Sequence, residues 1–220
     1  MCQCITKIAN GTHLQFELPD PDQDVMPDVP WGRMDQLFSP AYWSSLAWLR
    51  NWDDSSITMR FGQTFPEEIA ACLLGGYGIP AEVGLQAFYK LKQRGLLEQA
   101  TPESVIRGVL EEPLEFRDRR IRYRFARQKS NYLSKALQKV FNEPLPEIPP
   151  RQLRNWLIGL PGIGPKTASW IVRNWLGSND VAIIDIHIYR AGVLAGFFSL
   201  KDNVQSDYFD MEARFLWFAQ

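Results

Sequence analysis

The amino-acid sequence predicts an all-α fold built as two helical lobes, and three observations lead to this prediction. Prolines that suit the first turn of a helix precede apolar residues at helical spacing, at Pro40, Pro66, Pro80 and Pro102. Alternation typical of a strand is confined to one short segment, Thr12–Leu18. The sequence also lacks an internal repeat, so the helices are expected to form two lobes with a cleft between them, or else a single compact lobe.

The overall composition excludes several classes of protein. The 220 residues carry a formal net charge of −1 and a sequence pI near 6.2, so any attraction to nucleic acid must come from locally clustered charge. The three cysteines, Cys2, Cys4 and Cys72, are too few and too badly placed for a disulfide framework or an iron–sulfur cluster, and fit a reduced, cytoplasmic setting. The sequence has neither a signal peptide nor an apolar run of about 18 residues, so we expect no membrane partner.

The first two parts of the chain differ in their helical signals. Residues 1–38 are expected to form an extended N-terminal arm, because the segment DPDQDVMPDV is acidic and proline-spaced and cannot hold a helix. Residues 39–149 are expected to form a helical lobe. Its first helix begins where Ser39-Pro40 places a capping hydroxyl and an N1 proline. Its longest helix is expected to run from about Arg119 to Phe141, is basic, and ends at the proline-rich NEPLPEIPP.

The third part, residues 150–220, is expected to hold closely spaced helices that interleave with the preceding lobe. They are RQLRNWLIGL, then PKTASWIVRNWLG after a tight glycine turn, then IHIYRAGVLAGF after the apolar run VAII, and finally YFDMEARFLWFAQ.

The turn between the first two of these helices carries a site prediction. Gly162 and Gly164 in LPGIGPKTAS are spaced for a turn that a residue with a Cβ would make with difficulty. Backbone amides that lead into a helix N-terminus bind anions, and the expected anion is a DNA phosphate. The sequence therefore predicts a helix-hairpin-helix motif at the interlobe cleft. The alternative is a glycine-containing connection without a ligand.

The hairpin and the segment that follows it carry a specific resemblance to a known family. LIGLPGIGPKTASWIV followed by VAIIDIHIYRAG resembles the helix-hairpin-helix DNA glycosylase superfamily, and most closely its lysine-bearing 8-oxoguanine DNA glycosylase/AP lyase branch. Asp185 follows Lys166 by 19 positions, and Asp185 and His187 stand in the Asp-x-His order of that branch. The likeness is dense over residues 150–197, and weaker upstream in FPEEIAACLLGGYGIPAEVG and YRFARQKSNYL.

The resemblance implies an activity, a partner and a cofactor requirement. It implies a bifunctional DNA glycosylase/AP lyase that excises 8-oxoguanine from duplex DNA in base excision repair. The enzyme would act as a monomer, through a Schiff base on a lysine, and would nick the strand by β-elimination. No cofactor would be required, and a structural monovalent cation would be held by hairpin carbonyls at the matching positions, Ile158, Leu160 and Ile163.

Lys166 and Asp185 are the expected catalytic residues. Cleaving an N-glycosidic bond passes through a sugar with oxocarbenium character, which a nucleophile and a nearby carboxylate both assist. If Gly164 is the N-cap of its helix, Lys166 lies in the first turn, where the helix dipole favours a free amine, and burial against Trp170 would act in the same direction. Asp185 is expected to cap the next helix and to stay ionised, facing positive charge on the sugar.

Each of these residues also has a simpler interpretation. Asp185 alone would be read as a plain helix cap, and Lys166 as a phosphate-contacting lysine of a structural hairpin. Their spacing favours the catalytic interpretation. Similarity suggests that His187 contacts a phosphate beside the extruded nucleotide, although a core histidine is an equally ordinary interpretation.

A basic segment supplies the charge clustering that the net charge conceals. RDRRIRYRFARQK, between Arg117 and Lys129, holds six arginines and one lysine against one aspartate, with Tyr123 and Phe125 interleaved, which favours DNA contact over a merely solvated face. Arg127, Gln128 and Lys129 are the expected DNA-binding residues, and the resemblance places Gln128 or Lys129 near the residue that fills the gap left by a flipped base.

An extruded purine requires an apolar or aromatic slot. Trp170, one turn after Lys166, and Phe215, Trp217 and Phe218 of the final helix are the expected pocket residues. Gln63 is a weaker candidate for reading the base edge.

Two other functions are compatible with the sequence. The same chemistry on another damaged or modified base would use the same residues. A non-catalytic DNA-binding module would use the hairpin only for phosphate, but a carboxylate beside the backbone would then repel the DNA, so Asp185 argues against this alternative.

Overall fold

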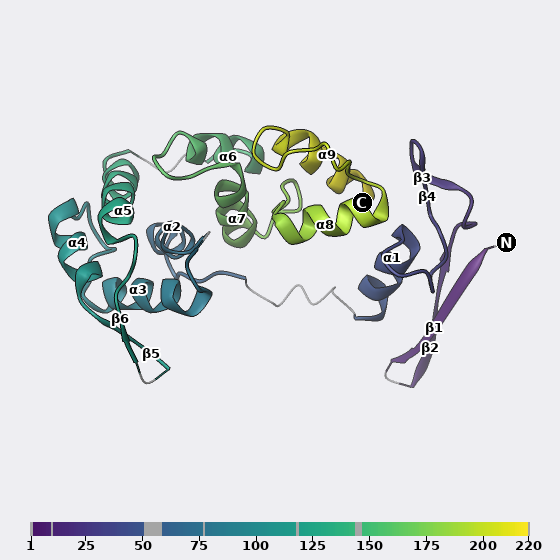
Figure 1. Ribbon diagram of the computed structural model, residues 1–220, viewed down its shortest axis with the longest axis horizontal. Coiled ribbons are helices and arrows are strands. Elements are labelled where there is room, and N and C mark those ends of the chain that lie inside the picture. Colours follow the sequence, from purple (N-terminus) through teal and green to yellow (C-terminus); the bar gives the residue numbers. More distant parts are fainter. Residues whose placement is uncertain are drawn as a thin grey trace. The chain divides into compact units, whose positions relative to one another are not determined.

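The computed structural model describes residues 2–9, 11–50, 59–76, 78–117, 119–143 and 147–219. Within these ranges the chain forms nine helices and three two-stranded antiparallel sheets (Figure 1), so the predicted helical fold class is confirmed. The chain divides into two compact units. A terminal unit combines Met1–Thr58 with Ile184–Gln220, and a central unit comprises Met59–Ile183. This division differs from the expected boundaries at 38/39 and 149/150, because both ends of the chain pack into one unit.

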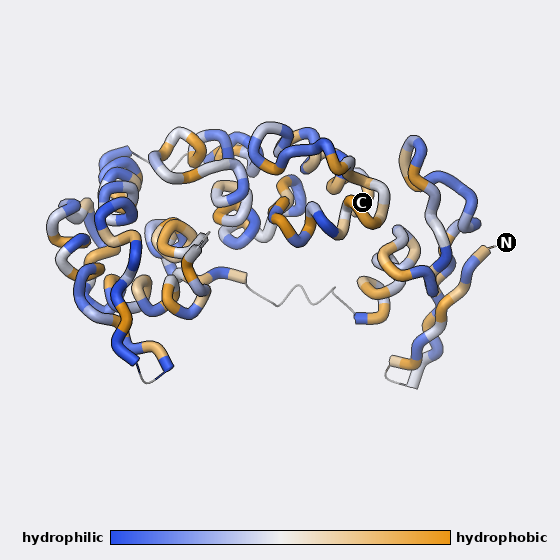
Figure 2. The backbone as a smooth tube through the Cα atoms, in the orientation of Figure 1, coloured by the Kyte–Doolittle hydropathy of each residue, from blue (hydrophilic) through white to orange (hydrophobic). Residues whose placement is uncertain are grey.

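The central unit is built around α2 (Phe65–Leu74), which is buried at every position except Pro66. A helix that is apolar on all sides must be surrounded by others, and α2 contacts α3 (Ala81–Gln93), α5 (Ala126–Asn142) and α7 (Pro165–Leu176). Figure 2 shows this contrast: the tube of α2 is largely hydrophobic, whereas α5 is mostly hydrophilic.

The remaining elements of the central unit cover its edges. They are α4 (Glu103–Glu111), β5 (Leu114–Phe116), β6 (Arg119–Ile121) and α6 (Pro150–Ile158). Thr64 caps α2, its hydroxyl accepting from the amide of Glu67. Thr101, which precedes Pro102, does not cap α4. Its hydroxyl instead donates to the carbonyl of Leu96, and Pro102 is the residue that precedes the helix.

The helix expected from Arg119 to Phe141 is wrong in its first turns. Arg119–Ile121 forms strand β6, paired with β5 in an antiparallel hairpin, and α5 begins only at Ala126. Tyr123 lies between them, buried, with its hydroxyl donating to the carbonyl of Leu74 at 2.6 Å. Burial raises the pKa of this hydroxyl. Burial of Tyr123 in the core therefore interrupts the helix that the local sequence favours.

The described residues of the expected N-terminal arm include two paired hairpins. β1 (Gln3–Ala9) pairs with β2 (Thr12–Leu18) in full antiparallel register, and β3 (Asp24–Met26) pairs with β4 (Val29–Pro30). The segment Thr12–Leu18 is thus a strand, as its alternation predicted. Its partner strand was missed. Gly11, with φ +75°, lies in the two-residue connection, the usual position for a glycine in a tight hairpin.

The terminal unit packs this hairpin on α1 (Pro40–Leu49). Trp48 of α1 stacks on Phe16 with a centroid separation of 5.5 Å and lies beneath the Lys7 ammonium at 4.3 Å. Ser39 caps α1 as predicted, its hydroxyl accepting from the amide of Tyr42.

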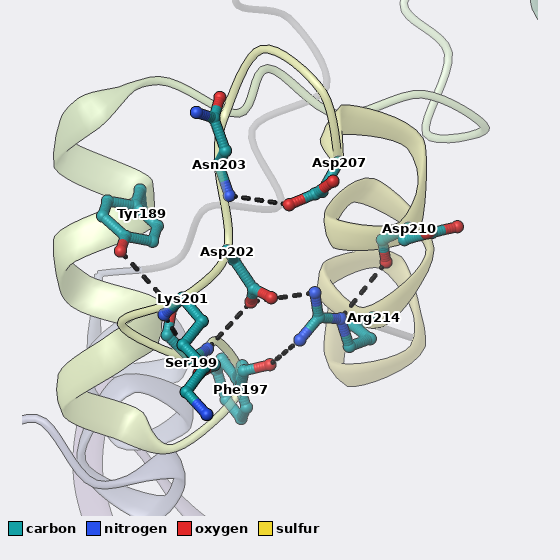
Figure 3. Close-up of polar contacts among 9 residues, drawn as sticks. All are labelled: Tyr189, Phe197, Ser199, Lys201, Asp202, Asn203, Asp207, Asp210 and Arg214. Carbon is teal, nitrogen blue, oxygen red and sulfur yellow. Dashed lines mark hydrogen bonds and ion pairs between the residues drawn. The ribbon is translucent and has the colours of Figure 1, made fainter.

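A polar network fixes the connection between α8 (Ile186–Ala195) and α9 (Tyr208–Ala219) (Figure 3). The guanidinium of Arg214 pairs with Asp202 at 2.9 Å and donates to the carbonyl of Phe197 at 3.1 Å. The Asp202 carboxylate also accepts from the amide of Ser199 at 2.8 Å. Because Arg214 of α9 binds Phe197, just after α8, and Asp202 in the middle of the loop, it ties this loop to α9.

Among the described residues, no helix is long and apolar enough to cross a membrane.

Candidate catalytic site

The predicted hairpin forms between α6 and α7. Gly162 has φ +78°, and a Cβ built on it would lie 2.1 Å from the Tyr132 ring of α5. Glycine is therefore required at this position for two reasons: the backbone has a positive φ, and the Tyr132 ring occupies the space of a Cβ. Gly164 differs: it is extended, exposed and the N-cap of α7, and no described atom lies within 4 Å of its added Cβ. The open space leaves room for a ligand at the helix N-terminus, where unpaired amides attract an anion.

Lys166 occupies the first turn of α7, as predicted, with Gly164 as N-cap and Pro165 at N1. The side chain is half-buried. Trp170 follows one turn later and packs edge-on against Phe61, with 5.9 Å between the ring centroids. Trp170 therefore packs on the segment before α2, and its place beside an extruded base stays a prediction.

The segment that carries Phe61 is held by a buried carboxylate that the sequence interpretation missed. One oxygen of Glu68 accepts from the amides of Phe61 at 2.8 Å and Gly62 at 2.9 Å. The other accepts from the side-chain amide of Asn174 in α7 at 2.8 Å. Glu68 thus ties the segment before α2 to the helix of Lys166. The sequence signal was the Glu67-Glu68 pair, which had been interpreted only as a helix start.

The neighbouring residues confirm that this part of the site is structural. The thiol of Cys72 lies 3.7 Å from Glu68, and burial raises its pKa, so it is a poor nucleophile. Gln63 is exposed, and its backbone amide donates to Glu67 at 2.7 Å.

Asp185 is the N-cap of α8, as predicted. A single carboxylate oxygen accepts from the amides of His187 at 2.8 Å and Ile188 at 2.9 Å, which leaves its second oxygen available to another partner. His187 is exposed, so the alternative of a core histidine is wrong. Asp185 belongs to the terminal unit and Lys166 to the central unit, so their pairing stays a prediction of the sequence.

The hairpin carbonyls expected to hold a monovalent cation lie at the end of α6 and in the turn. The carbonyl of Leu160 accepts from the amide of Ile163 at 3.2 Å, which leaves it one further lone pair. Ile158 is the last residue of α6. In the described part of the chain, no group of three His, Cys, Asp or Glu residues is placed to hold a metal. Neutral carbonyl oxygens suit an alkali cation, so the donor set fits the expected group.

The basic segment is divided between the β5–β6 hairpin and the start of α5. Arg127 and Gln128 are exposed, and the Gln128 amide donates to the hydroxyl of Tyr132, the residue packed on Gly162. Arg124, Arg127 and Gln128 line a pocket of about 510 Å³ together with Tyr132. Exposed Arg124 and Arg127 therefore line the same pocket as Tyr132, which packs against the hairpin at Gly162.

Lys129 is placed differently from the two residues before it. Its ammonium donates to the carbonyl of Gly75, where α2 ends, at 3.2 Å, and burial lowers its pKa. This hydrogen bond ties α5 to the end of α2, so we expect Lys129 to contact phosphate less readily than the exposed Arg127.

The expected pocket residues fall into three places. Phe215 and Phe218 of α9 line an apolar pocket of about 460 Å³ in the terminal unit. Trp217 faces a different pocket, beside Val29 and Arg214. Trp170 belongs to the central unit, with Phe61. The structure therefore brings Phe215 and Phe218 together and separates Trp217 from them.

The glycine hairpin, the lysine in the first turn of the second helix and the aspartate that caps the following helix define a lysine-bearing helix-hairpin-helix protein. A family model described as 8-oxoguanine DNA glycosylase (Ogg-HhH) matches residues 55–220, more than half of the chain. The chain belongs to this family.

Individual relatives carry the same name. An 8-oxoguanine DNA glycosylase/AP lyase of Saccharolobus islandicus is 35% identical over 121 residues, which are 50% of this chain and 54% of the relative. A protein of that name from Saccharolobus solfataricus is 39% identical over 101 residues, 41% of this chain and 48% of its own. The chain thus spans about half the length of these curated relatives. The solved 8-oxoguanine DNA glycosylase of Thermotoga maritima matches 69% of this chain and 68% of its own at 25% identity, with a TM-score of 0.47.

The two hairpin glycines should respond differently to alanine. Gly162→Ala is expected to lower the free energy of unfolding by about 2 kcal/mol or more, since it combines a positive φ with a clash against Tyr132. Gly164→Ala should cost less than about 1 kcal/mol. Urea unfolding of both variants measures the difference, and equal losses would contradict the distinction.

The basic residues at the start of α5 should also separate. Arg127→Gln is expected to reduce the slope of log K against log salt for duplex DNA by about 0.9, the value of one phosphate contact. Lys129→Gln should leave this slope unchanged, because its amine serves Gly75. Fluorescence anisotropy across a salt series measures both slopes. A reduced slope in Lys129→Gln alone would reverse the two assignments.

Proposed function

We propose that this protein is a DNA glycosylase with AP lyase activity that excises 8-oxoguanine from duplex DNA through a Schiff base on Lys166. The observation that carries the proposal is the position of this lysine, half-buried in the first turn of α7 directly after the hairpin. The family membership of the chain and the names of its relatives support the substrate and both activities.

The chemistry would proceed from the amine of Lys166. Its Nζ, unprotonated, attacks C1′ of the sugar as the bond from C1′ to the base breaks, and the base leaves with that electron pair and takes a proton. The sugar ring then opens to give an imine between Nζ and C1′. Loss of a proton from C2′ expels the 3′ phosphate by β-elimination, and water finally releases the lysine. An amine nucleophile makes this route available, because an imine acts as an electron sink.

Asp185 would serve the first of these steps. Its carboxylate is oriented by two backbone amides and keeps one oxygen available, so it presents a fixed negative charge at a helix N-terminus. Such a preorganised charge stabilises the positive character that the sugar acquires as the base departs.

Binding of the duplex would rest on the hairpin and the basic residues. The open space at Gly164 allows a phosphate to approach the N-terminus of α7, and exposed Arg127 lies on the helix whose Tyr132 packs under the hairpin. His187 would contact a neighbouring phosphate. The protein would bind the duplex as a monomer. A monovalent cation on the carbonyls of Ile158, Leu160 and Ile163 would hold the turn in place.

Replacement of the nucleophile should abolish covalent capture. Lys166→Gln is expected to give no borohydride-trapped complex with an 8-oxoguanine duplex, whereas Lys135→Gln, at an exposed position of α5, should trap like the parent. Denaturing gels resolve the cross-linked species. Undiminished trapping by Lys166→Gln would show that another amine attacks. A panel of duplexes with other modified bases, tested in parallel, determines whether 8-oxoguanine is the preferred substrate.

The aspartate variant separates catalysis from capping. Asp185→Asn should keep the cap and change the free energy of unfolding by less than about 0.5 kcal/mol, because asparagine and aspartate cap helices equally well. Base excision should nevertheless fall by about 100-fold or more, the usual effect of removing a preorganised electrostatic group. Single-turnover excision and thermal unfolding provide the two measurements. Parental excision by this variant would leave Asp185 with a capping role alone.

A further inference from the structure

The apolar pocket of the terminal unit is lined by three helices. Trp43, Leu46 and Ala47 of α1 form one side, and Ile188 of α8 with Phe215 and Phe218 of α9 forms the other. Its volume of about 460 Å³ lies within the range of small-molecule pockets, about 300–1,000 Å³. Aromatic rings on both sides suit a flat, uncharged heterocycle, which gains stacking on its faces without losing an ionic partner.

The two sides of this pocket differ in their relation to the family. The helices α8 and α9 lie inside residues 55–220, which the family model matches, whereas α1 ends at Leu49 and lies outside them. One wall of the pocket is therefore contributed by a segment that the family model does not include.

The pocket adjoins the proposed catalytic carboxylate. Ile188, a lining residue, donates its backbone amide to Asp185 at 2.9 Å. Ala191 also lines the pocket and lies one turn further along the same face of α8. A base accommodated here would thus lie along the helix face that begins at Asp185, which is where the sugar bearing that base is proposed to react.

Aromatic contacts support both walls of the pocket. Trp43 is packed by Tyr42 and Phe38, with ring centroids at 5.3 and 6.0 Å. On the opposite side Phe218 packs on Phe197 at 4.3 Å, and Arg214 holds the loop before α9 (Figure 3). Aromatic walls supported in this way favour an occupant whose shape fits between them.

We propose that Trp43 is a specificity-determining residue, against which the extruded base packs, so that α1 decides which purine the enzyme accepts. This inference rests on the proposed function. Arg50 is the one charged residue among those that line the pocket, and the other lining side chains are apolar or aromatic. The pocket therefore favours a neutral purine over a charged base.

The test compares two reactions of the same protein. Excision of 8-oxoguanine requires the base to be bound, whereas borohydride trapping on a duplex with a preformed abasic site requires only the lysine. Trp43→Ala, which opens the wall, and Ala191→Phe, which fills the pocket, should each slow single-turnover excision by about tenfold or more, as expected from lost base stacking. Both should trap the abasic duplex within twofold of the parent. Leu49→Ala, at an exposed residue of α1 outside the pocket, is the matched control and should match the parent in both reactions.

Parental excision by both pocket variants would overturn the inference. Equal loss of excision and abasic trapping in both would also overturn it, because the pocket would then serve the fold or the lyase step. Failure of the unaltered protein to trap either duplex would instead refute the proposed function. A panel of modified purines adds a positive readout: Trp43→Ala should accept a bulkier purine relative to 8-oxoguanine than the parent does, and an unchanged ranking counts against the assignment.

Discussion

The packing of Tyr132 against Gly162 is the constraint on which the site depends. The ring occupies the space of a Cβ, and the backbone there has φ +78°, so only glycine satisfies both conditions. This contact fixes the hairpin against α5 and thereby sets where α7 begins. Because α7 begins at Pro165, Lys166 falls in its first turn, beside amides that have no partner within the helix. The open N-terminus of α7 and the amine of Lys166 are thus placed by the same contact.

Polar side chains that join different elements hold the central unit in one arrangement. Glu68 joins the Phe61–Gly62 segment to Asn174 of α7, and Lys129 joins α5 to the end of α2. Each of these side chains satisfies backbone groups that are left without partners where an element ends. A buried polar group is costly unless it is hydrogen-bonded, so each tie specifies one arrangement of the elements that it joins. In the terminal unit Arg214 has a similar role, because its guanidinium binds Phe197 and Asp202 of the α8–α9 loop.

Local signals predicted the helix starts well and the pairing of strands poorly. Ser39, Gly164 and Asp185 are caps in the structure because capping depends on a few adjacent residues. The strand Gln3–Ala9 was missed although the sequence has Asn-Gly directly before Thr12, a pattern typical of a two-residue hairpin. The basic run was read as one helix because arginine favours helices, but burial of Tyr123 and pairing of β6 with β5 outweigh that preference.

The sequence by itself determined the family, the helical class, the hairpin and the residues expected to react, since all of these rest on short spacings along the chain. Only the tertiary structure decided which side chains are available. It assigned Lys129 to Gly75, seated Tyr132 on Gly162, and separated Trp217 from the pocket of Phe215 and Phe218. It also brought α1 to α8 and α9. These outcomes depend on burial between segments far apart in the chain, and no local pattern encodes which distant surface will cover a side chain.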